Sequence, residues 1–271
     1  MLVIPDTWLE RWKGQDVFDQ LFTIDGQVYR EHEGRKTMQF SIDGKSYFVK
    51  FHRGIGWKEI IKDLLRFRLP VMSAENEWQG IKRCNQLGVN TARLVGYGKR
   101  GWNPAKLQSF VVTGELTNTV SLEDLGYEWR KSPPSYALKK ALITEVAKIS
   151  RSIHENGLNH RDLYICHFLL DISNDKDEID PKQIRLFLID LHRMQMRRRT
   201  PKRWRVKDIA ALYYSSMNIG LTKRDLLRFV RVYRNKPLKV TLKEDRAFWN
   251  RVKKRGEAFY REGVRKNWVK E

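Results

Sequence analysis

The sequence predicts an α+β fold in two lobes, because its strand-like segments and its clearest helices fall in different parts of the chain. Apolar alternation between residues 27 and 51 is interrupted by turn signals at Gly34 and at Asp43-Gly44, which predicts a three-stranded antiparallel meander. Helical patterns dominate beyond residue 115. We therefore expect an N-terminal lobe over residues 1–115 and a C-terminal helical lobe over residues 116–271.

The most regular helix is expected to begin at Pro133-Pro134-Ser135 and to stop at Gly157. Its apolar residues recur at the spacing of one helix face: Leu138, Leu142, Val146, Ile149 and Ile153. Further helices are expected over residues 57–69, 74–87, 206–217 and 223–234, and strands over residues 109–113, 168–171 and 185–190. A Thr241…Glu244 capping box predicts the start of the last helix.

Composition limits the class of protein. The chain has 271 residues, with 41% hydrophobic and 11% aromatic content, which is too aromatic for a disordered chain. The formal charge of +21 predicts a polyanionic partner. No zinc-finger spacing, RNP-type motif or basic zipper supports nucleic acid as that partner, and we expect no nucleic acid.

The cysteines and the apolar runs bear on the compartment. Cys84 and Cys166 form neither a disulfide framework nor a C-x-x-C pair, so a reducing compartment is expected. The N-terminus lacks a cationic segment followed by an apolar run, and no stretch approaches the ~20 apolar residues that span a bilayer. We expect a cytoplasmic protein, or one on the cytosolic face of a membrane.

Four features stand in an order that suits phosphoryl transfer. Lys50 ends the third predicted strand, Glu77 lies on a following helix, His160-Arg161-Asp162 follows the long helix, and Asp190 ends an apolar strand. In a kinase, a lysine held by a glutamate neutralises the ATP phosphates, one aspartate accepts the acceptor's proton, and another holds magnesium. The order predicts a bilobal, protein-kinase-like enzyme that transfers the γ-phosphoryl group of ATP to a hydroxyl group.

Each residue also has a simpler explanation. Alone, Lys50 is most often a solvated lysine at a strand end, and Glu77 a helix-surface charge that Glu75 could replace. Asp190 is harder to explain in this way, because a charge at the end of a buried strand is costly unless it has a function. The joint occurrence, each feature in its strand or helix context, favours the kinase.

Longer strings carry a family resemblance: residues 50–57 (KFHRGIGW), 77–78 (EW), 159–170 (NHRDLYICHFLL), 189–193 (IDLHR) and 201–205 (PKRWR). On these residues the chain resembles the lipopolysaccharide core heptose(I) kinases of Gram-negative bacteria over essentially its full length. The resemblance implies a transferase that phosphorylates the first heptose of the inner core with ATP and magnesium. It also implies that Asp162 is the catalytic base, with His160 and Arg161 beside it, that Lys50 binds phosphates, and that Asp190 binds the metal.

Two positions depart from the ordinary protein-kinase pattern. In place of a glycine-rich phosphate loop the chain has Glu33-Gly34-Arg35-Lys36, so we assign Gly34, Arg35 and Lys36 to ATP binding together with Glu77. In place of the asparagine that holds a second metal it has His167. Imidazole suits magnesium less well than an amide oxygen does, so His167 contacts a phosphate, holds a metal weakly, or has a structural role.

Two other roles are weighed near the catalytic loop. Asp208 stands where kinase-like folds carry an aspartate that accepts backbone N–H groups of that loop, and a helix-start acid favoured by the dipole is the alternative. A zinc site formed by His154, His160, Cys166 and His167 matches no usual ligand spacing.

The segment after Asp190 is strongly basic. It contains Arg193, Arg197, Arg198, Arg199, Lys202, Arg203, Arg205 and Lys207. A solvated face is the alternative interpretation, but Pro201 and Trp204 within the segment favour order. Arginine suits carboxylates and phosphates, so we assign all of these cations except Lys207 to binding an anionic acceptor, the lipid A–core glycolipid.

The C-terminal helices mix cations with aromatic residues, among them Phe229, Phe248, Trp249, Phe259 and Trp268. This pattern is compatible with docking on the anionic inner leaflet and also with a buried core. The charge is equally compatible with an acidic protein partner such as an acyl carrier protein. Two other functions stay open: a protein kinase acting on Ser, Thr or Tyr, and a non-enzymatic module that binds polyanions.

Overall fold

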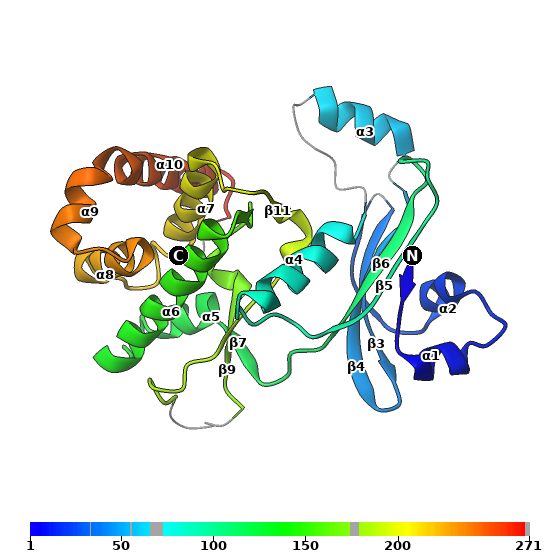
Figure 1. The fold of residues 1–271 in the computed structure, drawn as a ribbon. Helices are drawn as coiled ribbons and strands as arrows, with labels where there is room; N and C mark the ends of the chain where they lie inside the picture. The colour runs from blue at the N-terminus through cyan, green and yellow to red at the C-terminus, as the bar shows by residue number, and fades with distance from the viewer. Residues whose placement is uncertain (33, 55, 66–72, 174–178, 269–271) are drawn as a thin grey trace. The chain divides into compact units, whose positions relative to one another are not determined.

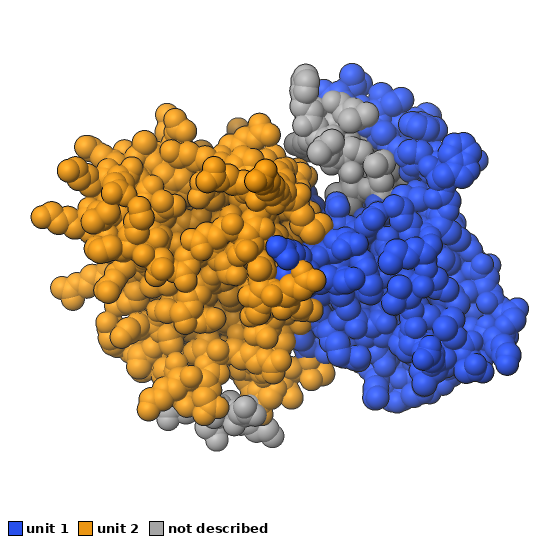
Figure 2. Space-filling model, in the orientation of Figure 1, with its two compact units in different colours: residues 1–83, 92–116, 191–193 blue, residues 84–91, 117–190, 194–271 orange. Residues whose placement is uncertain are grey.

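The computed structural model describes residues 1–32, 34–54, 56–65, 73–173 and 179–268. It contains two compact units (Figure 2). Unit 1 comprises Met1–Arg83, Ala92–Leu116 and Leu191–Arg193, and unit 2 comprises Cys84–Thr91, Thr117–Asp190 and Met194–Glu271. The division into a nucleotide lobe and an acceptor lobe stays a prediction about function.

Unit 1 is built on a six-stranded sheet in the order β1-β5-β6-β4-β3-β2, with all neighbours antiparallel. Its strands are β1 (Leu2–Val3), β2 (Gln27–His32), β3 (Arg35–Ile42), β4 (Lys45–His52), β5 (Leu94–Arg100) and β6 (Gln108–Gly114). β2, β3 and β4 confirm the predicted meander. The sequence did not indicate β5, because its Gly96 and Gly98 are poor strand formers.

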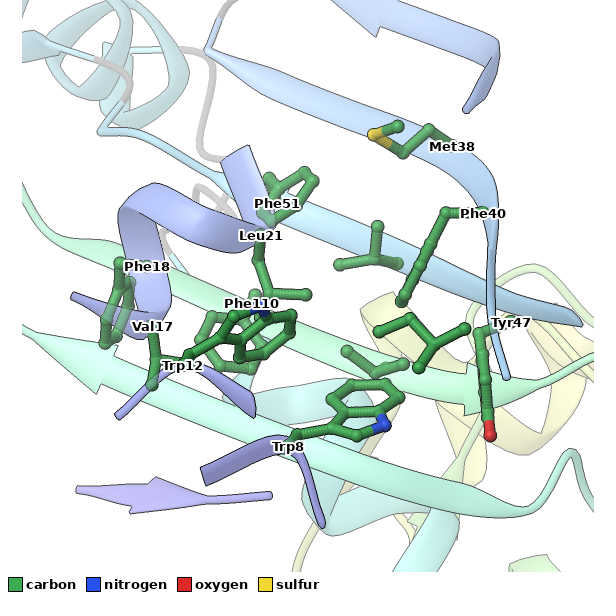
Figure 3. Close-up of a cluster of buried hydrophobic side chains, with 13 residues drawn as sticks. Trp8, Trp12, Val17, Phe18, Leu21, Met38, Phe40, Tyr47, Phe51 and Phe110 are labelled. Carbon is green, nitrogen blue, oxygen red and sulfur yellow. The ribbon is translucent and has the colours of Figure 1, made fainter. Parts of the chain in front are cut away.

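One face of this sheet carries an aromatic core (Figure 3). Met38 of β3 and Phe51 of β4 meet side chains from two short helices, α1 (Asp6–Arg11) and α2 (Val17–Thr23). Trp8 of α1 packs edge-on against Tyr47 with ring centroids 5.1 Å apart. Tyr47, Val49 and Phe51 of β4 point into this core, so the core fixes the position of the strand.

The opposite face of the sheet is covered by α4 (Glu75–Gln86), as Figure 1 shows. Trp78 of α4 stacks on Tyr97 of β5 with ring centroids 5.1 Å apart and an interplanar angle of 19°. Side chains alternate across a strand, and Phe51 points into the aromatic core. The neighbouring Lys50 therefore points to the α4 face.

Unit 2 is mainly helical. Its helices are α5 (Leu122–Glu128), α6 (Tyr136–Glu155), α7 (Lys202–Ser215), α8 (Lys223–Arg234), α9 (Leu238–Glu244) and α10 (Arg246–Arg265). α6 confirms the predicted long helix: Ser135 caps it by accepting from the N–H of Leu138. α8 has the predicted bounds and the predicted Thr222–Asp225 capping box.

Short strands hold the loops of unit 2. β7 (Thr119–Ser121), β9 (Phe168–Asp171) and β10 (Leu186–Leu188) form a three-stranded sheet, and β8 (Leu158–Asn159) pairs with β11 (Gln195–Met196). Two 3-10 turns follow the two aspartate motifs of the sequence: η1 (Ile165–His167) follows Asp162, and η2 (Leu191–Arg193), which belongs to unit 1, follows Asp190.

Two predicted helix starts differ from the structure, and a third predicted helix is described only in part. The predicted start at residue 206 is wrong, because α7 begins directly after Pro201 and four polar and aromatic residues precede its apolar stretch. The predicted capping box is also wrong: Thr241 lies buried inside α9, and α10 begins at Arg246. α3 (Gly56–Leu65) matches the beginning of its predicted helix, and the rest of that prediction lies outside the described residues.

Candidate active site

Lys50 and Glu77 form an ion pair in unit 1. The Lys50 Nζ lies 2.8 Å from Glu77 Oε1, and the Glu77 side chain is only 6% exposed. Glu75, the other glutamate considered for this pairing, instead lies 2.5 Å from Lys99. The structure therefore brings together the lysine and the glutamate that the kinase interpretation requires.

The predicted phosphate loop begins with a close backbone approach. Gly34 has a φ of +73°, and a Cβ at this position would lie 2.4 Å from the carbonyl oxygen of Gly54, so glycine is required there. Arg35 pairs with His52 and Thr37 with Lys50, which places Arg35 on the face that carries Lys50. Lys36 falls on the opposite face, and Glu33 lies outside the described residues.

His52 separates Arg35 from Lys50 on this face without adding charge. It is 4% exposed, and burial, assisted by the nearby cations Arg35 and Lys50 and by His192, lowers the pKa of His52 to about 3. The imidazole is therefore neutral at physiological pH, so His52 adds no positive charge to that of Arg35 and Lys50.

Asp208 braces the catalytic loop in unit 2, which confirms the role weighed above. Its carboxylate accepts the backbone N–H groups of His160 at 2.7 Å and Arg161 at 2.9 Å. It also contacts His154 Nε2 at 3.2 Å, while His154 Nδ1 lies 2.8 Å from the Tyr233 hydroxyl. Because a carboxylate only accepts, His154 Nε2 is the donor in its contact with Asp208.

His160 ties the catalytic loop to the segment that carries Asp190. Its Nε2–H donates to the carbonyl oxygen of Ile189 at 3.0 Å. Burial, and then the neighbouring His167, lower the pKa of His160, so its imidazole is neutral. Each aspartate motif contains a residue that is not glycine and yet has a left-handed backbone: φ is +75° at Arg161 and +61° at Asp190. Such backbone strain is often found at functional sites.

His167 lies between the two predicted functional aspartates. Its Nδ1–H donates to the backbone carbonyl of Asp162 at 2.8 Å, and its Nε2 lies 3.7 Å from the Asp190 carboxylate. The His167 ring also stacks on His160, with centroids 5.6 Å apart. These contacts support a structural role for His167, and they leave its predicted contact with a phosphate or metal as a proposal.

Lys207 is a residue whose role the sequence did not indicate. It precedes Asp208 on α7, and its Nζ donates to the carbonyl oxygen of Arg161 at 2.5 Å. The same Nζ lies 3.9 Å from Asp162 Oδ1. Consecutive residues of one helix thus hold both the N–H and the C=O of Arg161, and Lys207 puts a cation beside the predicted base.

A cationic cluster surrounds one indole ring in unit 2. Four cations lie 5.3–5.9 Å from the ring centroid of Trp204: Arg161, Arg197, Arg203 and Lys207. Arg197 is held further by Asn159 at 2.6 Å and Gln195 at 2.7 Å. Burial and the charge of Arg203 lower the pKa of Arg197. We call these four residues and Trp204 the Trp204 cluster.

The remaining predicted acceptor residues are placed differently. Arg198, Arg199 and Lys202 are exposed on unit 2, Arg205 is half-buried, and Arg193 belongs to unit 1. Only Arg197 and Arg203 of the predicted set therefore join the Trp204 cluster, and Arg161 and Lys207 complete it. The clustering requires tertiary structure, because Arg161 comes from the His160-Arg161-Asp162 loop, Arg197 from the segment between β11 and α7, and Arg203 and Lys207 from α7.

The described residues contain no group of three His, Cys, Asp or Glu side chains that could hold a metal ion by themselves. The zinc arrangement of three histidines and Cys166 is therefore not formed among them. Burial raises the pKa of the Cys166 thiol to about 12. Along the described parts of the chain, no helix combines the length and apolar character needed to cross a membrane.

The sheet-bound lysine with its glutamate, the braced His-Arg-Asp loop and the second aspartate after a strand define a phosphotransferase of the protein-kinase-like class. Comparison with known proteins identifies the family. The model of the lipopolysaccharide kinase (Kdo/WaaP) family matches residues 19–233.

Relatives extend this match over nearly the whole chain. The lipopolysaccharide core heptose(I) kinase WaaP of Pseudomonas aeruginosa is 48% identical over 96% of each chain. The same-named kinase of Escherichia coli K12 is 44% identical over 95% of this chain and 96% of its own. A solved structure titled WaaP in complex with acyl carrier protein gives a TM-score of 0.83 at 42% identity, covering 96% of this chain and 99% of that one.

The chain belongs to the lipopolysaccharide kinase (Kdo/WaaP) family. It is an ATP-dependent phosphotransferase of lipopolysaccharide core biosynthesis that acts on a hydroxyl group, and the predicted kinase-like α+β fold is confirmed.

Proposed function

We propose that this enzyme phosphorylates a hydroxyl group of the first heptose in the lipopolysaccharide inner core and that Asp162 is its general base. The observation that carries this proposal is the Trp204 cluster, which gathers four cations around one ring and includes Arg161 of the loop that presents Asp162 and Lys207 beside Asp162. An acceptor surrounded by carboxylated sugars and lipid A phosphates suits such a cluster. A peptide hydroxyl does not require it.

The main contacts to ATP are expected to be made to its phosphates. The ammonium of Lys50 neutralises the α- and β-phosphates while Glu77 holds its position, as in other enzymes of this class. The position of Arg35 on the same face as Lys50 supports a second phosphate contact from Arg35. Gly34 lets the β2–β3 turn approach Gly54 closely, and Lys36 is the weaker candidate because it points to the other face.

Magnesium fits the donor set that the chain offers. Mg²⁺ is commonly held by one or two carboxylates together with substrate phosphates and water, which explains how a site can exist without three protein ligands in one place. Asp190 is the proposed ligand, and His167 beside it is the proposed contact for a phosphate or an inner-sphere water. When bound, the ion neutralises charge that develops on the transferred phosphoryl group.

Within the Trp204 cluster we assign different tasks to its cations. The Lys207 Nζ lies 3.9 Å from Asp162 Oδ1, so we assign to Lys207 the alignment of this carboxylate for the acceptor hydroxyl. Arg161, Arg197 and Arg203 bind anionic groups of the acceptor, and the exposed Arg198, Arg199 and Lys202 attract it from a distance. Arg193 and Arg205 remain proposed contacts for the same glycolipid.

An acyl carrier protein is a proposed partner. The relative of known structure was solved with such a protein, and the charge of +21 suits an acidic one. Unit 2 also contains an apolar cavity of about 460 Å³ among α6, α8 and α10. Its walls include Leu142, Leu226, Phe229 and Trp249, which could receive the acyl chain that such a partner carries.

Peripheral association with the inner leaflet, and thus a cytoplasmic location, is also proposed. Most of the C-terminal aromatics pack within unit 2: Tyr233, for example, stacks on Phe229 and Phe248. A different surface, on unit 1, exposes large apolar side chains: Trp57 (54%), Ile61 (52%), Leu65 (76%) and Trp102 (92%). The exposed Lys58 is next to Trp57 in sequence, and the exposed Lys106 follows Trp102 by four positions. Trp and Lys together favour an anionic lipid surface.

The decisive experiment measures phosphate transfer from Mg-ATP to core glycolipid that lacks the heptose phosphate. Asp162→Asn should lower kcat by about 10³-fold, because general base catalysis contributes about 10²–10⁴-fold. Asp25→Asn is the matched control, since Asp25 is an exposed carboxylate of unit 1. Near wild-type transfer by Asp162→Asn contradicts the mechanism, and equal rates with peptide acceptors contradict the substrate.

A further inference from the structure

A second cavity of unit 2, of about 420 Å³, lies against the catalytic loop. Its volume falls within the range of small-molecule sites, about 300–1,000 Å³. Its walls are formed by aromatic rings together with two carboxylates, among them Tyr127, Tyr164, Tyr214, Tyr260, Glu123 and Glu262. We call it the aromatic pocket.

The aromatic pocket is joined to the proposed base by a short chain of contacts. Tyr164 follows Asp162 by two positions and lies 5.9 Å, ring to ring, from His167, which in turn binds the backbone of Asp162. The end of α7 holds the loop there, because Ser215 Oγ accepts the N–H of Ile165 at 2.9 Å. A ligand in the pocket would therefore contact the loop that carries Asp162 through Tyr164.

The rings of the pocket support one another. Tyr214 packs edge-on against Tyr164 and Tyr260, with centroids 6.3 and 6.4 Å apart. The Tyr260 hydroxyl donates to Asn218 at 3.2 Å. All these side chains are half-buried, so they are held in place and still present surface to a ligand.

The chemistry of this wall differs from that of the Trp204 cluster. Glu123 and Glu262 repel anions, although Lys266 binds one oxygen of Glu262 at 2.6 Å. Burial, and then Glu123, raise the pKa of Tyr127 and Tyr214, so both phenols remain protonated donors. Aromatic faces pair with the apolar face of a sugar ring, and carboxylate, amide and phenol groups pair with its hydroxyls.

We propose that the aromatic pocket binds a neutral sugar ring of the acceptor core, while the Trp204 cluster binds its anionic groups. This inference rests on the proposed function, since only a glycan acceptor supplies both kinds of group. The two sites touch different residues of one loop: Arg161 belongs to the cluster and Tyr164 to the pocket. Binding at both fixes the acceptor in two places, so that one hydroxyl is selected for Asp162.

The test uses Tyr260→Ala and Glu123→Gln in the full-length enzyme, with Tyr136→Ala as the matched control. Tyr136 is a 68% exposed tyrosine of α6 that does not line the pocket. Each pocket variant should raise the KM for deacylated core oligosaccharide about tenfold, as expected for loss of about 1.4 kcal/mol of contact. The KM for ATP and any acceptor-independent transfer of phosphate from ATP to water should stay unchanged.

Direct binding provides a readout independent of turnover. A neutral heptose-containing disaccharide without carboxylate or phosphate should perturb wild-type NMR signals and should perturb those of Tyr260→Ala much less. Tyr260→Phe keeps the ring and should retain binding, which separates loss of stacking from misfolding. An unchanged acceptor KM, or an equal rise in the KM for ATP, overturns the inference.

The outcomes also separate this inference from the proposed function. Wild-type enzyme that fails to phosphorylate the heptose acceptor contradicts the proposed function itself. Wild-type enzyme that succeeds while both pocket variants match it contradicts only the sugar site. Loss of acyl carrier protein binding by the variants, with acceptor KM unchanged, assigns the pocket to that protein and overturns the inference.

Discussion

Unit 1 and unit 2 each position one part of the proposed catalytic machinery, and they do so with different forces. Lys50 is positioned by the register of a sheet whose other face is an aromatic core. The loop that carries Asp162 is positioned by polar contacts: the fully buried carboxylate of Asp208 accepts two backbone N–H groups, and Lys207 donates to the carbonyl oxygen of Arg161. The first arrangement is shared among many apolar contacts, whereas the second depends on a few hydrogen bonds, two of which Asp208 accepts.

This difference predicts how function and stability are coupled in each unit. Removing a polar group from the Lys50 face leaves the aromatic core of unit 1 intact, so activity should fall without unfolding. Removing Asp208 leaves buried backbone N–H groups of His160 and Arg161 without their acceptor, which costs stability as well as geometry. Mutations can therefore test the contrast directly.

The largest effect is expected for Asp208→Ala. Unfolding by urea should show a loss of about 3 kcal/mol, because charged hydrogen bonds contribute about 1.5–3 kcal/mol each and buried N–H groups are left unsatisfied. kcat should fall by about 10³-fold, because the proposed base loses its alignment. The control is Ser150→Ala, a buried hydroxyl of α6 that donates to Val146 of the same helix. A stable and active Asp208→Ala enzyme contradicts the bracing role.

The next effect is expected in unit 1. Glu77→Gln should lower kcat/KM by about 10²-fold, comparable with loss of one preorganised electrostatic contact. Its unfolding free energy should change by less than about 1 kcal/mol. Glu75→Gln, which removes the neighbouring pair with Lys99, is the control and should retain most activity.

A double-mutant cycle sharpens this prediction. Lys50→Met and Glu77→Gln act on one ion pair, so their combined effect should be little larger than that of Lys50→Met alone. Additive losses indicate that Glu77 acts separately from Lys50. An equal loss in Glu75→Gln contradicts the assignment of Glu77.

Much of this site could be predicted from the sequence, because its signals are local or ordered along the chain. The turns at Gly34 and Asp43-Gly44 predicted the meander and placed Lys50 at the end of its third strand, and the observed register puts Lys50 opposite Thr37. The choice of Glu77 over Glu75 could not be made from the sequence. Both lie in the first turn of α4, and only the structure shows that Glu77 pairs with Lys50 and Glu75 with Lys99.

The parts that the sequence left open are contacts between distant segments. Asp208 was a possible helix-start acid until its three partners were seen. Lys207 was one cation among eight, and only the tertiary structure brings its Nζ to 3.9 Å from Asp162 Oδ1. The mistaken capping box at Thr241 has the opposite cause, because a short local motif also occurs by chance inside a helix such as α9.

Substitution of Trp204 tests whether this ring organises the proposed acceptor site of unit 2. Trp204→Leu should raise the KM for glycolipid about tenfold, because each cation–π contact contributes about 0.5–2 kcal/mol. Trp204→Phe should show a smaller rise, since it keeps an aromatic face. The KM for ATP should not change in either variant. A larger effect on ATP than on glycolipid contradicts the assignment of the cluster to the acceptor.

The smallest effect concerns pH, and it compares one buried histidine from each unit. The pKa is lowered by burial for His52, to about 3, and also for His160. The unfolded chain binds a proton at each site below about pH 6.5, the ordinary pKa of histidine, whereas the folded protein does not. Stability is therefore complete above that pH and falls as pH decreases, by at most about 1.4 kcal/mol per pH unit for each histidine.

His52→Gln isolates the contribution of unit 1 to this slope. Between pH 6.5 and 5, its unfolding free energy should fall less steeply than that of wild type, with a slope smaller by up to about 1.4 kcal/mol per pH unit. The pH dependence that remains includes the contribution of His160. Urea unfolding at several pH values measures the difference, and kcat of Mg-ATP-dependent transfer at pH 7.5 checks that the site is intact. Equal slopes for the two proteins mean that His52 takes up a proton in the folded state, which contradicts its burial as a neutral group beside Arg35 and Lys50.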